Sequence, residues 1–191
     1  MKKILNLAIL AVLAAVVLVA ASCRSRTDRS PGPVVLTFGA INGIPTVVSV
    51  GTAIAGTTST PPGVSIQSFT LQSVVKEPTP GITPAIEDVE VSSYQVVYRR
   101  RDSGTRVPPP LVAALGIEVP VNGTSVINNL PIVRLDQLLS PPLGDLASLG
   151  HDSETGTTVI VLDAQITFFG HTLSGDAVSS GTASYTLEFI P

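Results

Sequence analysis

The sequence has 191 residues, of which 11 are basic and 14 acidic, so its formal net charge is −3, and 44% of its residues are hydrophobic. This slightly acidic balance gives no reason to expect a nucleic-acid partner, because nucleic-acid-binding proteins present a concentrated basic surface. The single cysteine excludes an internal disulfide, and sparse charges beside abundant Val, Thr, Ser, Gly and Pro favour strands and turns.

An apolar run near the N-terminus is typical of a secretory signal. Lys2 and Lys3 precede residues 4–21, which are interrupted by a polar side chain only at Asn6. A positive start followed by an apolar segment is the pattern of a signal peptide. The run is roughly 18 residues long, near the minimum for crossing ~30 Å of hydrocarbon, so an uncleaved anchor helix is the alternative.

The residues after this run resemble the bacterial lipobox. Small residues fill positions 20–22 directly before Cys23, and the chain becomes polar at Arg24. The resemblance implies that the thiol of Cys23 carries diacylglycerol and that residues 1–22 are removed as a signal peptide. Arg24 stands where an aspartate would retain the protein in the inner membrane, so the implied address is the outer membrane. The sequence departs from the commonest lipobox at Ala20, where leucine is more usual. An ordinary secretory signal without lipidation is a further alternative for this N-terminus.

The remainder divides into a tether and one domain. Residues 23–33 have no apolar periodicity and contain Pro31-Gly32-Pro33, which is typical of a flexible linker. Ten such residues, fully extended, reach roughly 30 Å. Residues 34–191 are numerous enough to form one domain with a hydrophobic core.

The first half of this domain contains four predicted strands. Residues 34–38 and 46–50 are short apolar segments, and residues 64–75 form a longer one whose apolar phase changes after Ile66. A single bulge would restore one buried face there. Residues 89–99 present two apolar sets, as expected if the sheet register shifts or both faces are partly covered.

The middle of the domain combines a hairpin signal with two helical candidates. Asn122-Gly123 is a favoured turn dipeptide and predicts a hairpin between residues 117–121 and 125–133. A turn or two of helix is predicted for residues 110–115 and for residues 134–139, where leucines recur at helical spacing.

The C-terminal third carries the clearest strand pattern. Apolar and other residues alternate along residues 160–168 and again along 183–189, and this period of two predicts strands. A loop around Gly175 joins them, which predicts a long antiparallel hairpin. The apolar rows expected in the core are Ile160, Leu162, Ala164, Ile166, Phe168, Ala183, Tyr185, Leu187 and Phe189.

Seven or more short strands with turn signals between them predict an all-β fold, an antiparallel β-sandwich of immunoglobulin-like or fibronectin-III-like architecture. Residues 88–104 (DVEVSSYQVVYRRRDSG) and 163–175 (DAQITFFGHTLSG) are similar to uncharacterised bacterial lipoproteins with such a sandwich. This resemblance implies a fold but no activity, so it identifies no functional residue.

Catalytic and metal-binding signals are weak. A Ser-His-Asp hydrolase could use His151-Asp152-Ser153, or His171 with Asp176, but neither set lies in a nucleophile elbow. Adjacent residues of one loop do not readily form a triad, so we expect a solvated loop. The acidic residues nearby lack calcium-loop spacing, and two histidines without a free thiol are too few for a zinc site. The acidic residues without calcium-loop spacing are Asp152, Glu154, Asp163 and Asp176. We therefore expect no metal and no cofactor.

A basic cluster is the remaining candidate site. Arg99, Arg100, Arg101 and Arg106 concentrate positive charge at the end of a predicted strand, where they could contact anionic headgroups, lipopolysaccharide or an acidic partner. The alternative is a solvated strand end whose charges discourage strand addition. The prolines at 108–110 form either a stiff loop or a polyproline ligand.

Together these features favour a non-catalytic cell-envelope module that is anchored by lipid and binds an envelope protein or glycan, or packs in an assembly. The alternative is a lipid-anchored hydrolase or metal-dependent enzyme. That alternative requires a pocket in which His151 or His171 meets carboxylates.

Overall fold

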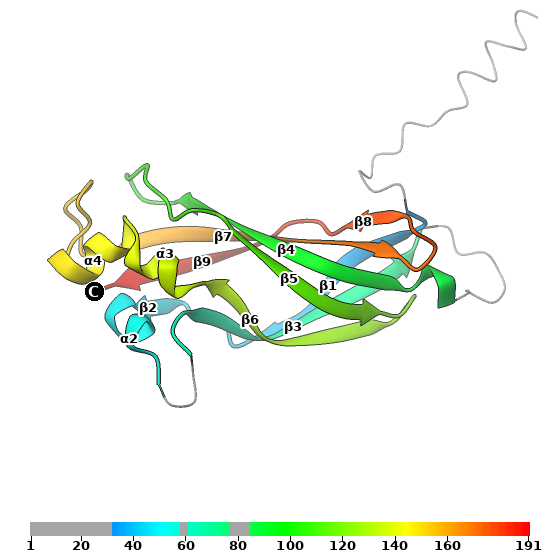
Figure 1. Cartoon of the computed structure of the whole chain (residues 1–191). Helices are drawn as coiled ribbons and strands as arrows, with labels where there is room; N and C mark the ends of the chain where they lie inside the picture. Colours follow the sequence, from blue (N-terminus) through cyan, green and yellow to red (C-terminus); the bar gives the residue numbers. More distant parts are fainter. Residues whose placement is uncertain (1–31, 58–60, 77–84) are drawn as a thin grey trace, which may run out of the picture.

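The computed structural model describes residues 32–57, 61–76 and 85–191 (Figure 1). The fold is mostly β, with 54% strand, and has two sheets, one of them curled into a half-barrel. The predicted signal peptide, Cys23 and most of the predicted tether lie outside the described residues.

The smaller sheet has the strand order β1-β3-β6, and the larger has the order β2-β9-β7-β4-β5, with β8 paired to the end of β7. The strands are β1 (Val34–Asn42), β2 (Val47–Ser49), β3 (Val64–Val75), β4 (Val89–Arg100), β5 (Leu111–Val119), β6 (Thr124–Val133), β7 (Ile160–Thr172), β8 (Ala177–Ser179) and β9 (Ala183–Ile190). Short helices are α2 (Val50–Ala55), η1 (Ala85–Glu87), α3 (Leu135–Leu139) and α4 (Leu143–Leu149).

The prediction of a purely antiparallel sandwich is wrong in one respect, because the larger sheet is mixed. β2 pairs parallel to β9, with Val48 opposite Phe189. After β1 the chain crosses from the smaller sheet to the larger through a short link and continues in the direction of β9, so the added edge strand is parallel. The predicted strand over residues 46–50 is shortened accordingly, because Val50 already begins α2.

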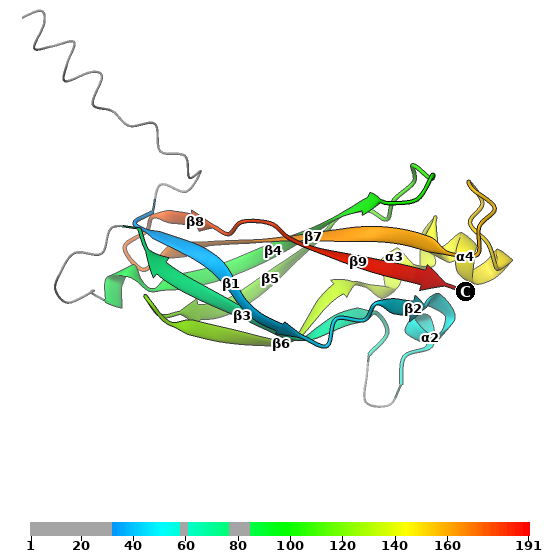
Figure 2. The ribbon, with the colours of Figure 1, turned by 180° about the vertical axis from the view of Figure 1, so that it is seen from behind.

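The body has two distinct ends (Figures 1 and 2). At one end the described chain begins, where Gly32 lies against Val178 of β8 and Pro33 O accepts a hydrogen bond from Lys76 N. We call this the tether end. The opposite end carries α2, α3, α4 and the C-terminus, and we call it the helical end. β4 runs between them, and its 12 residues span about 40 Å.

A register shift in β4 explains the two apolar sets that the sequence presents there. The ladders of β4 with β5 and with β7 both shift between Val91 and Ser93. The extra residue turns the later side chains onto the same face as the earlier ones, so Val89, Val91, Tyr94, Val96 and Tyr98 are all buried.

Gly170 of β7 lies opposite this bulge, and its substitution tests how closely the strands approach. In Gly170→Ala the new Cβ would meet the Glu90 carbonyl oxygen, a backbone atom that cannot move away alone. We expect a loss of about 1–3 kcal/mol in the free energy of unfolding, measured in urea. Gly181→Ala is the control, because nothing lies within 4 Å of its added Cβ; equal effects in the two variants would contradict the close approach.

The phase change in β3 is shared with β6 instead of being a bulge in β3 alone. Buried residues pass from Ile66 to Phe69 on β3 and from Leu130 to Ile127 on β6, while the pairing of these residues stays in step. Asn129 adopts a positive φ of 53° at this point. Both strands therefore bend together and keep their apolar side chains on the core face.

The Asn122-Gly123 turn is present, but the predicted hairpin is wrong. Asn122 has φ 54°, and Gly123 N donates to Pro120 O at 2.9 Å. However, β5 pairs with β4 and β6 pairs with β3, so the turn carries the chain from one sheet to the other. The predicted helix at residues 110–115 is also wrong, because this segment lies mostly in β5. The predicted helix at 134–139 is confirmed as α3.

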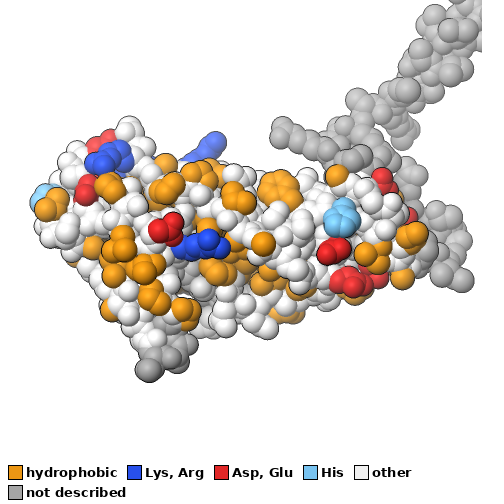
Figure 3. Space-filling view, in the orientation of Figure 1, with side chains coloured by type: hydrophobic (Ala, Val, Ile, Leu, Met, Phe, Trp, Pro, Cys, Tyr) orange, Lys and Arg blue, Asp and Glu red, His pale blue; other side chains and the backbone are white. Residues whose placement is uncertain are grey.

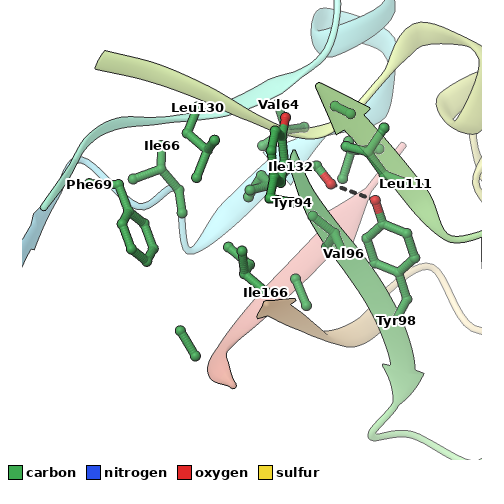
Figure 4. Packing of buried hydrophobic residues seen from close by; sticks show 14 of the residues in the cluster. Val64, Ile66, Phe69, Tyr94, Val96, Tyr98, Leu111, Leu130, Ile132 and Ile166 are labelled. Carbon is green, nitrogen blue, oxygen red and sulfur yellow. Dashed lines mark hydrogen bonds between the residues drawn. The ribbon is translucent and has the colours of Figure 1, made fainter. Parts of the chain in front are cut away.

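The C-terminal hairpin and its buried row are confirmed. β7 pairs antiparallel with β9 from Ile160 opposite Phe189 to Ile166 opposite Ala183. The predicted apolar positions are buried, except that Tyr185 is half-buried. The core lies between the sheets, where Phe69 of β3 meets Phe168 of β7 with ring centroids 5.1 Å apart. Figure 4 shows Tyr94 and Tyr98 of β4 reaching towards β6, where the hydroxyl of Tyr98 donates to Ile132 O.

Candidate functional site

The arginines of the predicted basic cluster lie in different environments. Arg100 is inside the protein, with its side chain only 3% exposed, so it does not form part of a contact surface. Its Nε lies 2.6 Å from Asp102 and its Nη2 lies 3.0 Å from Asp152. Its Nη1 also donates to Arg106 O at 3.2 Å. Arg100 is therefore the centre of a buried ion-pair network.

Asp152, predicted as a candidate catalytic or metal-ligating residue, is fully buried beside Arg100. Burial alone would raise the pKa of this carboxyl. Hydrogen bonds from Thr155 Oγ1 and from Arg100 outweigh burial, so the pKa is lowered. The pKa of Asp102 is also lowered, since bonds from Arg100 and from the backbone N–H of Val161 outweigh its burial. Both carboxylates are therefore ionised at neutral pH.

Glu154 completes the connection between two loops. Its carboxylate accepts hydrogen bonds from Thr105 Oγ1 at 2.6 Å and from the backbone N–H groups of Thr105 and Arg106. These hydrogen bonds lower the pKa of Glu154, and the bond from Thr105 Oγ1 has the largest effect. We call Arg100, Asp102, Thr105, Asp152 and Glu154 the loop clamp, because they tie the β4–β5 loop to the α4–β7 loop at the helical end.

The exposed arginines of the cluster are largely matched by carboxylates. Arg101 lies 3.4 Å from Asp163, and Arg106 lies 3.5 Å from Asp145. Arg99 is exposed, and no ion pair joins it to a carboxylate of the described residues. Figure 3 shows basic and acidic side chains next to each other at the helical end. The excess of positive charge that favoured an anionic partner is thus limited to Arg99.

The candidate triads are not assembled in the described structure. His151 is exposed, with Nδ1 3.0 Å from Leu149 O, while Ser153 Oγ donates to Asp145 and Asp152 belongs to the loop clamp. At the tether end His171 lies 3.5 Å from Glu90, and no hydrogen bond joins it to Asp176.

The two histidines cannot share a pocket. His151 precedes β7 at the helical end and His171 lies near the end of that strand, so the 13 residues of β7 separate them by roughly 40 Å. Figure 3 shows histidine side chains towards opposite ends of the body. His151 and His171 therefore do not line one common pocket.

Metal-binding groups are also dispersed. Across residues 32–57, 61–76 and 85–191, no cluster of three or more His, Cys, Asp or Glu side chains could hold a metal ion. Asp163, one of the acidic candidates, instead accepts a hydrogen bond from Thr186 Oγ1 at 2.7 Å and pairs with Arg101. In the same part of the chain, the helices are all too short or too polar to cross a bilayer.

Two concave features lie beside β2 and the start of β3. One groove of about 380 Å³ runs between β2, α2 and β3, with Val47, Ser49 and Thr52 in its wall. A second of about 390 Å³ adjoins it at Pro45 and Ser65. The described residues that line both grooves are all uncharged. These grooves were not predicted, because they form where three separate elements meet.

The proline run before β5 lies against α3, because Pro109 O accepts a hydrogen bond from Gln137 Nε2. Gln137 is 2% exposed and its Oε1 also accepts from Tyr98 Oη and from Arg134 N. The proline run is thus held against the folded body.

No protein-family model, curated protein or solved structure matches this chain.

Proposed function

We propose that this protein is a lipid-anchored cell-envelope protein of bacteria, with a two-sheet domain that serves as a non-catalytic structural or binding module. The observation that carries the proposal is the small-residue stretch ending in Cys23, followed by a polar segment that joins the domain at its tether end. A lipid on Cys23 would hold that end within roughly 30 Å of a membrane. Arg24 supports an outer-membrane address, and the two sheets are consistent with an immunoglobulin-like or fibronectin-III-like module.

The dispersal of acid–base residues supports a non-catalytic role. The negative charge of Asp152 is compensated by its ion pair with Arg100, and the two histidines lie towards opposite ends of β7. A lipid-anchored hydrolase or metal-dependent enzyme remains the alternative, and no specific arrangement of the described residues favours it. The uncharged grooves beside β2 suit a neutral segment of an envelope protein or glycan better than an anionic ligand.

The anchor is tested by Cys23→Ser, which removes the only thiol that can accept a diacylglycerol group. We expect the variant to lose all metabolic labelling with palmitate and to retain its signal peptide, because cleavage follows lipidation. Gel mobility and membrane fractionation of whole cells measure both effects. Ser25→Ala, two residues later, is the matched control and should be labelled like the parent. Acylation of Cys23→Ser at the parental level would contradict the proposal.

A further inference from the structure

The edges of the two sheets differ in how they are protected. In the described structure the edge strands are β1 and β6 of the smaller sheet, and β2, β5 and the three-residue β8 of the larger. β1 is bridged at Leu36 by Ser180 and has a register shift between Phe38 and Ile41. β2 is only three residues long. β6 contains Pro131, and the carbonyls of Pro131 and Ile132 accept hydrogen bonds from Tyr94 and Tyr98. Short edges, bulges and proline all oppose strand addition.

The edge of β5 has no such protection along its first half. β5 has nine residues and pairs only with β4 among the described strands. Side chains occupy the backbone carbonyls at both of its ends. Gln137 Nε2 donates to Pro109 O just before the strand, and Ser125 Oγ donates to Glu118 O near its end. Between these points, residues 111–117 carry no charge, and Val112 is 64% exposed. An uncharged, accessible edge with free N–H and C=O groups is a template for another strand.

The regular part of this edge is short. The β4–β5 ladder passes from Val91 opposite Ile117 to Ser93 opposite Ala114, so β5 has an extra residue at 115–116. A bulge there bends the strand, and an added strand would pair chiefly with residues 111–114. We therefore expect an association with few hydrogen bonds and correspondingly low affinity.

We propose that two copies of this protein associate through antiparallel pairing of their β5 strands. An antiparallel pair centred on Ala113 places Val112 opposite Ala114 of the other copy, so small apolar side chains meet on the exposed face. The only charged residue of β5, Glu118, then lies at opposite ends of the pair, roughly 30 Å from its equivalent. The strand is thus complementary to itself in shape and free of opposed like charges. The proposal depends on the described strands alone and not on the lipid anchor.

Cysteine cross-linking tests the pairing and its register. Full-length Val112→Cys and Ala114→Cys variants with different affinity tags are purified in mild detergent, mixed and oxidised. Directly opposed strand residues satisfy the Cα separation of a disulfide, whereas two copies of residue 112 would be too far apart. The mixture should therefore give at least about fivefold more cross-linked dimer than either variant alone. The parent, which retains Cys23, gives the background.

A charge substitution provides an independent measurement. Val112→Lys should raise the dimer dissociation constant, measured by analytical ultracentrifugation, by at least about tenfold, because charges on an edge oppose pairing. Val126→Lys on β6 is the matched control at a similarly exposed valine, 49% exposed, and should leave association unchanged. Unchanged melting temperatures would show that both variants are folded. Cross-linking at background level, or equal effects of the two lysines, would overturn the proposal. Capture of a different protein in cells by the introduced thiol of Val112→Cys, with no cross-linked dimer between the Val112→Cys and Ala114→Cys variants, would also overturn it and assign this edge to a strand of another protein.

Discussion

Phe168→Ala is expected to lower the free energy of unfolding by about 3–5 kcal/mol, the usual cost of truncating a buried aromatic side chain. Phe168 is fully buried on β7 and lies between the two sheets. Its ring contacts Phe69, Tyr94 and Phe38, at centroid distances of 5.1, 5.8 and 6.2 Å. The loss would be a large part of the 5–15 kcal/mol typical of a domain. Denaturant melts followed by circular dichroism measure it.

The neighbouring residue supplies the control on the opposite face of the same strand. Thr167 is half-buried, and its hydroxyl lies 3.3 Å from that of Thr182 at the surface. Thr167→Ala should therefore change the free energy of unfolding by well under 1 kcal/mol. Equal losses for the two variants would mean that β7 is buried on both faces, and a larger loss for Thr167→Ala would mean that its faces are inverted.

Arg100→Met should have an effect of similar size, for an electrostatic reason. The substitution leaves Asp152, which is fully buried, without its cationic partner. Removal of one partner of a buried ion pair commonly costs about 3–5 kcal/mol, because the remaining charge is uncompensated. Urea unfolding at pH 7 measures the change. Arg101→Met is the matched control: Arg101 is 59% exposed in its pair with Asp163, and such surface pairs contribute about 0–1 kcal/mol.

The same pair makes stability depend on pH in a defined direction. The pKa values of Asp102 and Asp152 are lowered in the folded protein, so their contribution is present above the unfolded values near 4. It is lost as the pH falls from there through the lower folded values. Arg100→Met should flatten this acid dependence, and adding Asp152→Asn should recover part of the stability at pH 7 by removing the uncompensated charge. Similar losses for Arg100→Met and Arg101→Met would contradict the buried-pair interpretation.

The parts of the fold that sequence predicts well are those decided by local periodicity. β7 and β9 alternate with a period of two, and side chains of a strand point alternately to its two faces, so the buried row could be read directly. The turn at Asn122 was predictable for a similar reason, because a positive φ is a property of a few residues. The partners of β5 and β6 were not, because local turn chemistry does not specify which strands pair.

The loop clamp was missed because its charges are far apart in the sequence. Arg100 and Asp152 are separated by 52 positions, and neither loop alone indicates that the other will cover it. The sequence alone therefore groups Arg100 with Arg99 and Arg101 in one exposed basic cluster. Alternation along β4 offers a partial signal, because Arg100 continues the inward phase of Tyr94, Val96 and Tyr98. The helix predicted at residues 110–115 failed because Leu and Ala suit helices locally, whereas pairing with β4 determines the structure.

If Cys23 carries the proposed lipid, the position of the tether end limits how far the body can extend from a bilayer. A single copy, with an extended tether of about 30 Å and a body whose β4 spans about 40 Å, could hold its α4 tip up to roughly 70 Å away. Antiparallel β5 strands would point the two tethers in opposite directions, and the lipids of such a pair could enter one leaflet only if both bodies lay flat. Crowding on the membrane would then convert a tall, pivoting form into a low form attached at two points.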